Sequence, residues 1–572
     1  MNRLQTVDER GDDATAEIPG AGPWQRTRRL LHLEREDIGV SIVYGVAIGV
    51  LSLMLPITAQ ALVTTVAFGS VLQPLFVLTL FFALAAAAAG ILGLLQAWVV
   101  EIIQQRVFAR TAADVAARLV RVPHGALDDI HIPDLLNRFF EVPTIQKALA
   151  SILVGGLGLV MQTLLGLTLL GFYHPLLLAF ALVLVVMLAV VVFVFGRGAV
   201  DSAIEESKAK YETVGWLEHL ARIPAAFNSA SGERLALTRA DTLVRGYLAA
   251  RRTHFRKLLL QSGGGVALAV VGSTTLLGLG GLLVLRNQLT LGQLVAAELV
   301  MASLSVALVK LGKQLESVYD LVQATTKLAM LVDLPAERRG GELLSGTGAD
   351  GSPAGLRCHG LTLARGTTTL LSGCTIDIAP AAKVAIGGAG GTGKSLLLDV
   401  LAGLRNPSAG SVELDGCDVR LLDLAAVRES VVLVRGAEFI DGSALANLRL
   451  LRHDAPIEQA ETILAHVGLQ DVVRALPDGL GTALQPSGAP LSSSQQRRLV
   501  LARALLARPR LLVLDNALDG LGVARATKLE ILDRVLAPDS PWTVVVVTDD
   551  SDVVERCTSA FTLELGKLRS TR

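Results

Sequence analysis

Long apolar blocks fill the chain up to about residue 310, and short apolar runs between polar turns follow from about residue 340. A helix needs about 20 apolar residues to cross a bilayer. Six blocks are long enough, at residues 38–67, 74–103, 148–172, 175–196, 260–285 and 290–312. One domain of this size cannot bury them all, so the pattern predicts six membrane spans, with the first kinked at Pro56.

The loops between these spans predict their orientation. The loops after the first, third and fifth spans are short, and Arg286 is their one basic residue. The loops after the second and fourth spans are long and carry many lysines and arginines, from Arg106 to Lys147 and from Arg197 to Lys257. Positively charged loops stay in the cytoplasm. We therefore expect both termini there, and a basic amphipathic helix at 24–37 on the inner membrane surface.

The change of pattern along the chain predicts a domain organisation. Residues 1–23 are polar and predict a mobile tail, and residues 24–333 hold the membrane domain. The stretch 334–355, rich in Gly, Ser and charge, is typical of a linker before a soluble α/β domain at 356–572. The long loops extend the spans as helices, and their tips at 123–140 and 214–230 either dock on a soluble domain or are solvated loops.

Composition narrows the possible partners. Half of the residues are apolar, and the mean hydropathy is +0.53, too high for an ordinary soluble protein. The chain has 52 Lys plus Arg and 52 Asp plus Glu, so its formal net charge is zero. No excess of positive charge indicates nucleic-acid binding, and no nucleic acid is expected as a partner. The four cysteines form no Cys-x-x-Cys pair, which favours buried thiols over a zinc site. Glu298 lies within the last span, either on a transport pathway or near a helix end.

The strongest motif lies at 384–404, VAIGGAGGTGKSLLLDVLAGL. A predicted strand leads into a loop with Gly388, Gly390, Gly391 and Gly393, and then into a predicted amphipathic helix. Glycines let backbone N–H groups surround phosphate oxygens, and the helix N-terminus faces their negative charge. In this motif Lys394 reaches the β- and γ-phosphates and the Ser395 hydroxyl binds Mg²⁺. The sequence therefore predicts ATP and Mg²⁺ as cofactors.

A second motif, LLVLDNALDGLG at 511–522, ends a predicted strand at an aspartate. Asp515 is expected to support the same Mg²⁺ from behind its direct ligands, so Ser395 and Asp515 form the predicted metal site. The next residue is Asn516, where such strands usually carry a glutamate. An amide can orient a water molecule but cannot accept its proton.

Six spans with two long cytoplasmic loops, followed by the phosphate loop, resemble a half-transporter of the ATP-binding cassette (ABC) exporter family. The stretch 476–522 resembles the family's signature helix and second nucleotide strand, and 431–448 resembles its glutamine loop. The membrane part, with LNRFFEVPTIQKAL, looks most like bacteriocin and toxin exporters. The resemblance implies a six-span helical domain with long cytoplasmic helical extensions, a C-terminal α/β P-loop nucleotide-binding domain, and a bacterial inner membrane location.

Compared with the family pattern, the nucleotide site is altered at most positions. Arg365 falls where an aromatic side chain would stack on adenine, and Arg435 where the glutamine would stand. The signature Leu-Ser-Gly-Gly-Gln becomes LSSSQ at 491–495, which keeps Ser492 and Gln495. Asn516 takes the general-base position and Asp549 the switch-histidine position, and Gly522 replaces an aspartate. Residues 541–560 contain no histidine, and Glu530 is the one glutamate in 511–530. A small shift of register therefore does not restore the general base or the switch histidine.

The resemblance also implies a dimer, because each ATP lies between the phosphate loop of one cassette and the signature of another. Three hypotheses follow. The chain is one subunit of a heterodimeric exporter whose partner hydrolyses ATP, or a homodimeric ATP-binding scaffold or channel with little hydrolysis, or an active homodimeric ATPase. The heterodimer is favoured, although the altered signature would also impair the partner's site. A periplasmic adaptor is a further possible partner, and the transported substrate is unknown.

Overall fold

The computed structural model describes residues 22–68, 72–128, 135–342, 351–365 and 368–572. The chain divides into two compact units, which we call the helical unit (Met1–Val122 with Asp129–Pro335) and the α/β unit (Pro123–Asp128 with Ala336–Arg572). Most of the tail predicted at 1–23, and residues 343–350 of the predicted linker, lie outside the described residues.

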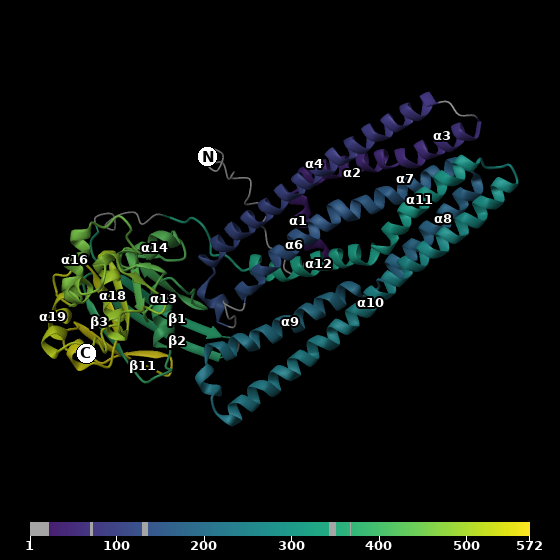
Figure 1. Ribbon diagram of the computed structural model, residues 1–572. Coiled ribbons are helices and arrows are strands. Elements are labelled where there is room, and N and C mark those ends of the chain that lie inside the picture. Colours follow the sequence, from purple (N-terminus) through teal and green to yellow (C-terminus); the bar gives the residue numbers. More distant parts are fainter. Residues whose placement is uncertain (1–21, 69–71, 129–134, 343–350, 366–367) are drawn as a thin grey trace. The chain divides into compact units, whose positions relative to one another are not determined.

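The helical unit consists of long helices that run side by side (Figure 1). Six stretches among the described residues are long and apolar enough to cross a membrane: Arg35–Thr65, Gln73–Leu119, Asn137–Tyr173, Pro175–Arg222, Ala230–Leu285 and Leu291–Val309. They coincide with the six predicted spans, and the second, fourth and fifth continue well beyond the apolar blocks. The main helices are α1 (Pro23–Leu33), α2 (Arg35–Ser52), α3 (Met54–Phe68), α4 (Leu72–Leu119), α6 (Val142–Ala150), α7 (Leu157–Tyr173), α8 (Pro175–Ala189), α9 (Ala199–Arg222), α10 (Ala230–Leu285), α11 (Leu291–Val309) and α12 (Leu311–Val332).

The first span is interrupted near Pro56, as its sequence predicts. Helix α2 ends at Ser52 and α3 begins at Met54. Proline has no N–H, so the Ser52 carbonyl, four residues earlier, loses its helical partner. The sixth span contains Glu298, whose Oε1 is buried and has no hydrogen-bond partner among the described residues. The role of this carboxylate in a pathway stays a prediction.

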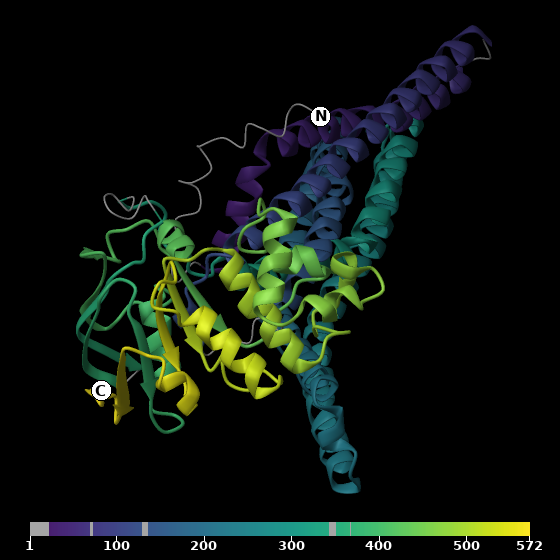
Figure 2. The same cartoon turned by 90° about the vertical axis from the view of Figure 1, so that its left-hand side faces the viewer.

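The α/β unit is built on a six-stranded sheet in the order β12-β11-β3-β10-β9-β6, seen from two directions in Figure 1 and Figure 2. Its strands are β3 (Lys383–Gly387), β6 (Val431–Arg435), β9 (Leu511–Asp515), β10 (Thr543–Val547), β11 (Ser559–Glu564) and β12 (Lys567–Ser570). All neighbours are parallel except β11 and β12. A four-stranded sheet contains β1 (Leu356–Arg365), β2 (Thr368–Ile378), β4 (Ala409–Leu414) and β5 (Cys417–Asp418), and a small ladder joins β7 (Gly442–Ser443) to β8 (Ala483–Leu484).

Two hydrophobic cores cover the two faces of the six-stranded sheet. In β9, Leu512 and Leu514 belong to one core, while Leu511 and Val513 belong to the other. A parallel strand buried on both faces is apolar without alternation, which explains the continuous run LLVL before Asp515. Helices of this unit include α13 (Lys394–Leu401), α14 (Leu424–Ser430), α15 (Ala444–Leu448), α16 (Ile457–His466), α17 (Gln470–Arg474), α18 (Ser493–Leu506), α19 (Arg525–Val535) and α20 (Ser551–Val554). The four cysteines are free, and Cys417 alone is not fully buried.

The segment Pro123–Asp128, at the tip of the first long loop, groups with the α/β unit. Its Asp128 carboxylate accepts two hydrogen bonds from Arg405, at 2.7 and 2.5 Å. The hydrogen bond and charge of Arg405 lower the pKa of Asp128 despite its partial burial. The tip predicted at 214–230 contains a short 3₁₀ turn, Pro224–Phe227, and belongs to the helical unit.

Candidate functional site

The site lies at one edge of the six-stranded sheet. The carboxyl ends of β3, β6, β9 and β10 meet there because these strands are parallel. The pairing places Arg435, the last residue of β6, directly opposite Asp515, the last residue of β9. Such an edge is where open α/β sheets bind ligands.

The phosphate loop connects β3 to α13. Gly388, Gly391 and Gly393 have φ angles of 137°, 80° and 98°, which only glycine adopts easily. A Cβ at Gly388 would lie 2.5 Å from the Leu563 carbonyl oxygen, so a side chain is excluded there. The Lys394 Nζ donates to the carbonyls of Gly388 and Ala389. Together with the N-terminus of α13, this loop has the backbone and charge that fit a triphosphate.

Arg435 forms the centre of the charge network beside this loop. Its Nε donates to Asp515 Oδ2 at 2.6 Å, its Nη1 to Asp399 Oδ1 at 2.7 Å, and its Nη2 to the Ser395 carbonyl at 2.7 Å. Asp399 also accepts a hydrogen bond from Arg405 at 3.2 Å. Burial acts to lower the pKa of Arg435, but Asp515 and Asp399 outweigh it, so the pKa lies above its usual value.

Asn516 follows Asp515 at the strand end, where the sequence predicts an altered general base. Its Nδ2 donates to Asp515 Oδ1 at 3.2 Å, and its φ is 51°. Asparagine is enriched among non-glycine residues with positive φ. Since its amide has no useful proton affinity, Asn516 cannot act as a base.

This arrangement does not fit the Mg²⁺ site expected from Ser395 and Asp515. One oxygen of Asp515 accepts from Arg435 and the other from Asn516. A permanent cation therefore sits on the carboxylate that was expected to face the metal.

The signature residues begin helix α18. Ser492 is the N-cap: its Oγ accepts from the Gln495 N–H at 3.4 Å, and Gln495 Oε1 accepts from the Ser492 N–H at 2.8 Å. These two residues thus form a reciprocal capping box. Next to them, a Cβ at Gly522 would lie 2.5 Å from the Ser494 Cβ. Relative to the family pattern, position 494 gains a side chain and position 522 loses one. The two altered positions are therefore neighbours.

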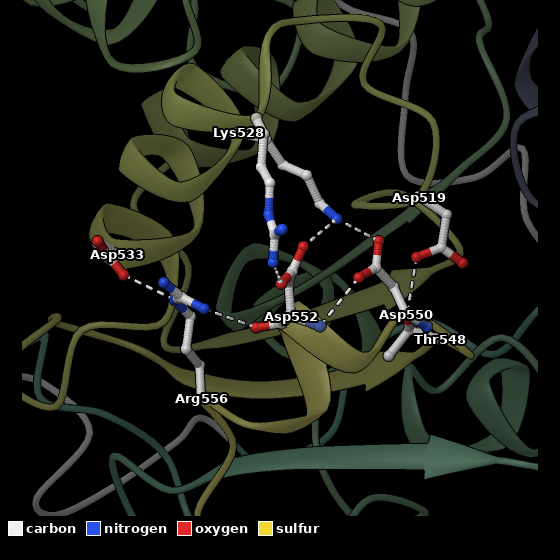
Figure 3. Close-up of polar contacts among 8 residues, drawn as sticks. Asp519, Lys528, Asp533, Thr548, Asp550, Asp552 and Arg556 are labelled. Carbon is white, nitrogen blue, oxygen red and sulfur yellow. Dashed lines mark hydrogen bonds and ion pairs between the residues drawn. The ribbon is translucent and has the colours of Figure 1, made fainter.

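The segment after β10 carries a group of acids (Figure 3). Lys528 donates to Asp550 and Asp552, at 2.5 and 3.0 Å. Thr548 donates to Asp519 at 2.6 Å. Burial raises the pKa of Asp519, and the charges of Asp550 and Asp549 raise it further. Asp549, at the expected switch position, is exposed.

Arg365, the predicted adenine-stacking residue, is exposed at the end of β1, and its Nη2 lies 3.5 Å from the Asp128 carbonyl oxygen. The stacking of Arg365 on the adenine ring stays a prediction. Sequence reasoning missed Asp399 and Arg405, which complete the network around Arg435. Asp399 follows Ser395 by four residues in α13, a spacing that places both on one helix face. That spacing was the available signal.

Two family models match this chain. Residues 38–216 match the ABC transporter transmembrane region, and residues 371–519 match the ABC transporter model. A solved bacterial Atm1-family ABC exporter with ATP bound shares the fold, with a TM-score of 0.82 over 93% of this chain and 94% of that one. The sequence identity to that structure is 18%.

Curated relatives are similar over part of their length. The mycobactin import ATP-binding/permease protein IrtB of Mycolicibacterium thermoresistibile is 28% identical over 55% of this chain and 54% of its own. The ATP-dependent lipid A-core flippase of Thiobacillus denitrificans is 31% identical over 50% and 49%, respectively. The chain thus spans about half the length of these relatives. With one membrane region joined to one cassette, this multi-span membrane protein belongs to the ABC transporters as a half-transporter of the exporter fold.

Proposed function

We propose that this half-transporter binds ATP at a degenerate site with little or no hydrolysis, and pairs with a competent second half-transporter to move a substrate across the bacterial inner membrane. Both termini are proposed to be cytoplasmic, as the basic loops predict. The observation that carries the proposal is the strand end at Asp515, which is followed by an amide and paired with Arg435.

The loss of a general base typically lowers a rate by about 10² to 10⁴. Here Asp549 also replaces a donor to the γ-phosphate by a negative charge, and Gly522 replaces an acid. The phosphate loop keeps its glycines, Lys394 and Ser395, so nucleotide binding is expected to persist. ATP held here would stabilise a closed cassette pair while the partner's site turns over.

The test uses the purified full chain in detergent or nanodiscs. We expect saturable ATP binding, and phosphate release no faster than that of Lys394→Ala. Rapid phosphate release that Lys394→Ala abolishes would instead support the active homodimeric ATPase.

A second experiment identifies the partner. The chain purified from its native membrane should carry a second cassette protein whose strand end has a glutamate and whose switch position has a histidine. Reconstituted together, the pair should release phosphate, and a Glu→Gln change in the partner should stop that release. Recovery of only copies of this chain would contradict the heterodimer.

The altered signature favours one alternative, a homodimeric ATP-binding scaffold or channel. Ser493 and Ser494 place Cβ atoms where glycines would allow close approach to a partner's nucleotide, and Ser494 is packed against Gly522. This would weaken the partner's site as well. The two relatives are named for mycobactin import and for lipid A-core flipping, so they do not single out a substrate or a direction for this chain.

A further inference from the structure

Arg435 contacts the carboxylate that the sequence associates with a divalent cation, beside the phosphate loop. The parallel register places Arg435 opposite Asp515, and the guanidinium contacts Asp515, Asp399 and the Ser395 carbonyl, each within 2.7 Å. Asn516 donates to the other oxygen of Asp515. Each oxygen of Asp515 therefore already accepts one hydrogen bond from a nitrogen donor of the chain itself.

Displacing Arg435 would leave Asp515 without its ion-pair partner, whereas Asp399 would keep its contact with Arg405. The side chains of Asp399 and Asp515 are only 5% and 4% exposed, and Arg435 is the sole ion-pair partner of Asp515 among the described residues. A buried carboxylate that loses its partner is strongly destabilising. A Mg²⁺ ion entering beside Arg435 would instead face a cation that cannot lose its proton.

The guanidinium can still reach a nucleotide. It has five N–H donors, of which the three contacts above use three. Its side chain is 36% exposed, so part of it is open to solvent beside the phosphate loop. Arginine binds phosphate oxygens in a bidentate manner, and Lys394 on the adjacent loop supplies a second positive charge.

We infer that this pocket binds the triphosphate of ATP without a divalent cation, and that the Arg435 guanidinium supplies the charge that a metal ion would otherwise provide. The inference rests on the proposed ATP binding and extends it. It also gives a reason for the poor hydrolysis: the pocket holds the nucleotide with groups of the chain that cannot polarise an attacking water as a metal does.

The experiment measures ATP affinity of the full chain by calorimetry, in excess Mg²⁺ and in excess EDTA. For the wild type we expect dissociation constants that differ by less than about threefold. Binding that requires Mg²⁺ would overturn the inference and leave the proposed ATP binding intact. No binding in either buffer would overturn both.

A variant tests the role of the guanidinium directly. Arg435→Gln removes the cation from Asp515, so EDTA should weaken its ATP binding by about tenfold or more. The matched control is Arg428→Gln, since Arg428 forms a comparable two-bond pair with Glu337, at 2.7 and 2.6 Å, away from the phosphate loop. The control should show the wild-type ratio of the two affinities. A ratio near one for Arg435→Gln would contradict the role of Arg435.

Metal retention provides a readout that does not depend on the variant folding. Wild-type protein loaded with ATP and Mn²⁺ and then desalted should retain nucleotide with almost no manganese. Equimolar manganese and nucleotide on the wild type would overturn the inference. Where Arg435→Gln folds, it should retain manganese together with its nucleotide.

Discussion

Asn516 combines a backbone preference with a chemical deficit. Its φ of 51° suits asparagine, and its amide bridges to Asp515. We expect Asn516→Glu alone to leave phosphate release at the level of Lys394→Ala, because Arg435, Gly522 and Asp549 remain. The new carboxylate would also lie beside Asp515, whose charge opposes it. A phosphate-release assay that shows a rise of about 100-fold would mean that the missing base is the only deficit.

Gly522 and Ser494 form a compensating pair. Gly522 has a φ of 63°, and a Cβ there would lie 2.5 Å from the Ser494 Cβ. We expect Gly522→Ala to lower the free energy of unfolding by about 1–3 kcal/mol, from strain at positive φ together with the clash. Adding Ser494→Gly should recover part of this loss.

The measurement is a double-mutant cycle on the thermal transition of the α/β unit in the full chain. A coupling of about 0.5–3 kcal/mol is expected for residues in contact. Strict additivity would show that the two positions are energetically independent.

At the scale of elements, the N-terminus of α18 depends on its capping box. Ser492 and Gln495 satisfy each other's backbone N–H groups. Ser492→Ala should therefore cost about 1 kcal/mol and accelerate hydrogen exchange in the first turn of α18. Ser493→Ala is the matched control, since Ser493 is the first helical residue and is exposed. Equal exchange rates in the two variants would exclude the cap as a stabilising feature.

At the scale of the whole molecule, Lys383 makes the stability of the α/β unit depend on pH. Its side chain is buried, and its Nζ donates to the Trp542 carbonyl at 2.5 Å. Burial lowers the pKa of Lys383 to about 8, although Cys557 and Asp539 oppose this. The unfolded chain, with an ordinary pKa of 10.5, binds more protons between these values. Stability from this group therefore rises as the pH increases from about 8 to about 10.5.

The comparison of wild type with Lys383→Met isolates this effect from other groups that titrate at alkaline pH. The melting temperature of the full-length wild type should rise relative to that of the variant as the pH increases through this window. A difference that does not change with pH would show that Lys383 has an ordinary pKa in the folded protein.

The sequence alone determined the membrane-spanning helices and the residue types at the nucleotide site. Six apolar blocks predicted six spans because crossing a bilayer imposes a length and a composition that local sequence reveals. Pro56 predicted the break in the first span, since a missing N–H is a property of the residue itself. The phosphate loop and the amide of Asn516 could also be identified from the sequence, because both are properties of the local residues themselves.

Only the tertiary structure decided which groups neutralise one another. Arg435 and Asp515 are 80 residues apart along the chain, and the parallel register of β6 and β9 brings them opposite each other. From the sequence, Arg435 is a cation at a glutamine position, and Asp515 is the expected partner of the Mg²⁺ ion, behind its direct ligands. Their pairing, and the contact of Ser494 with Gly522, depend on long-range packing, which no local pattern of residues encodes.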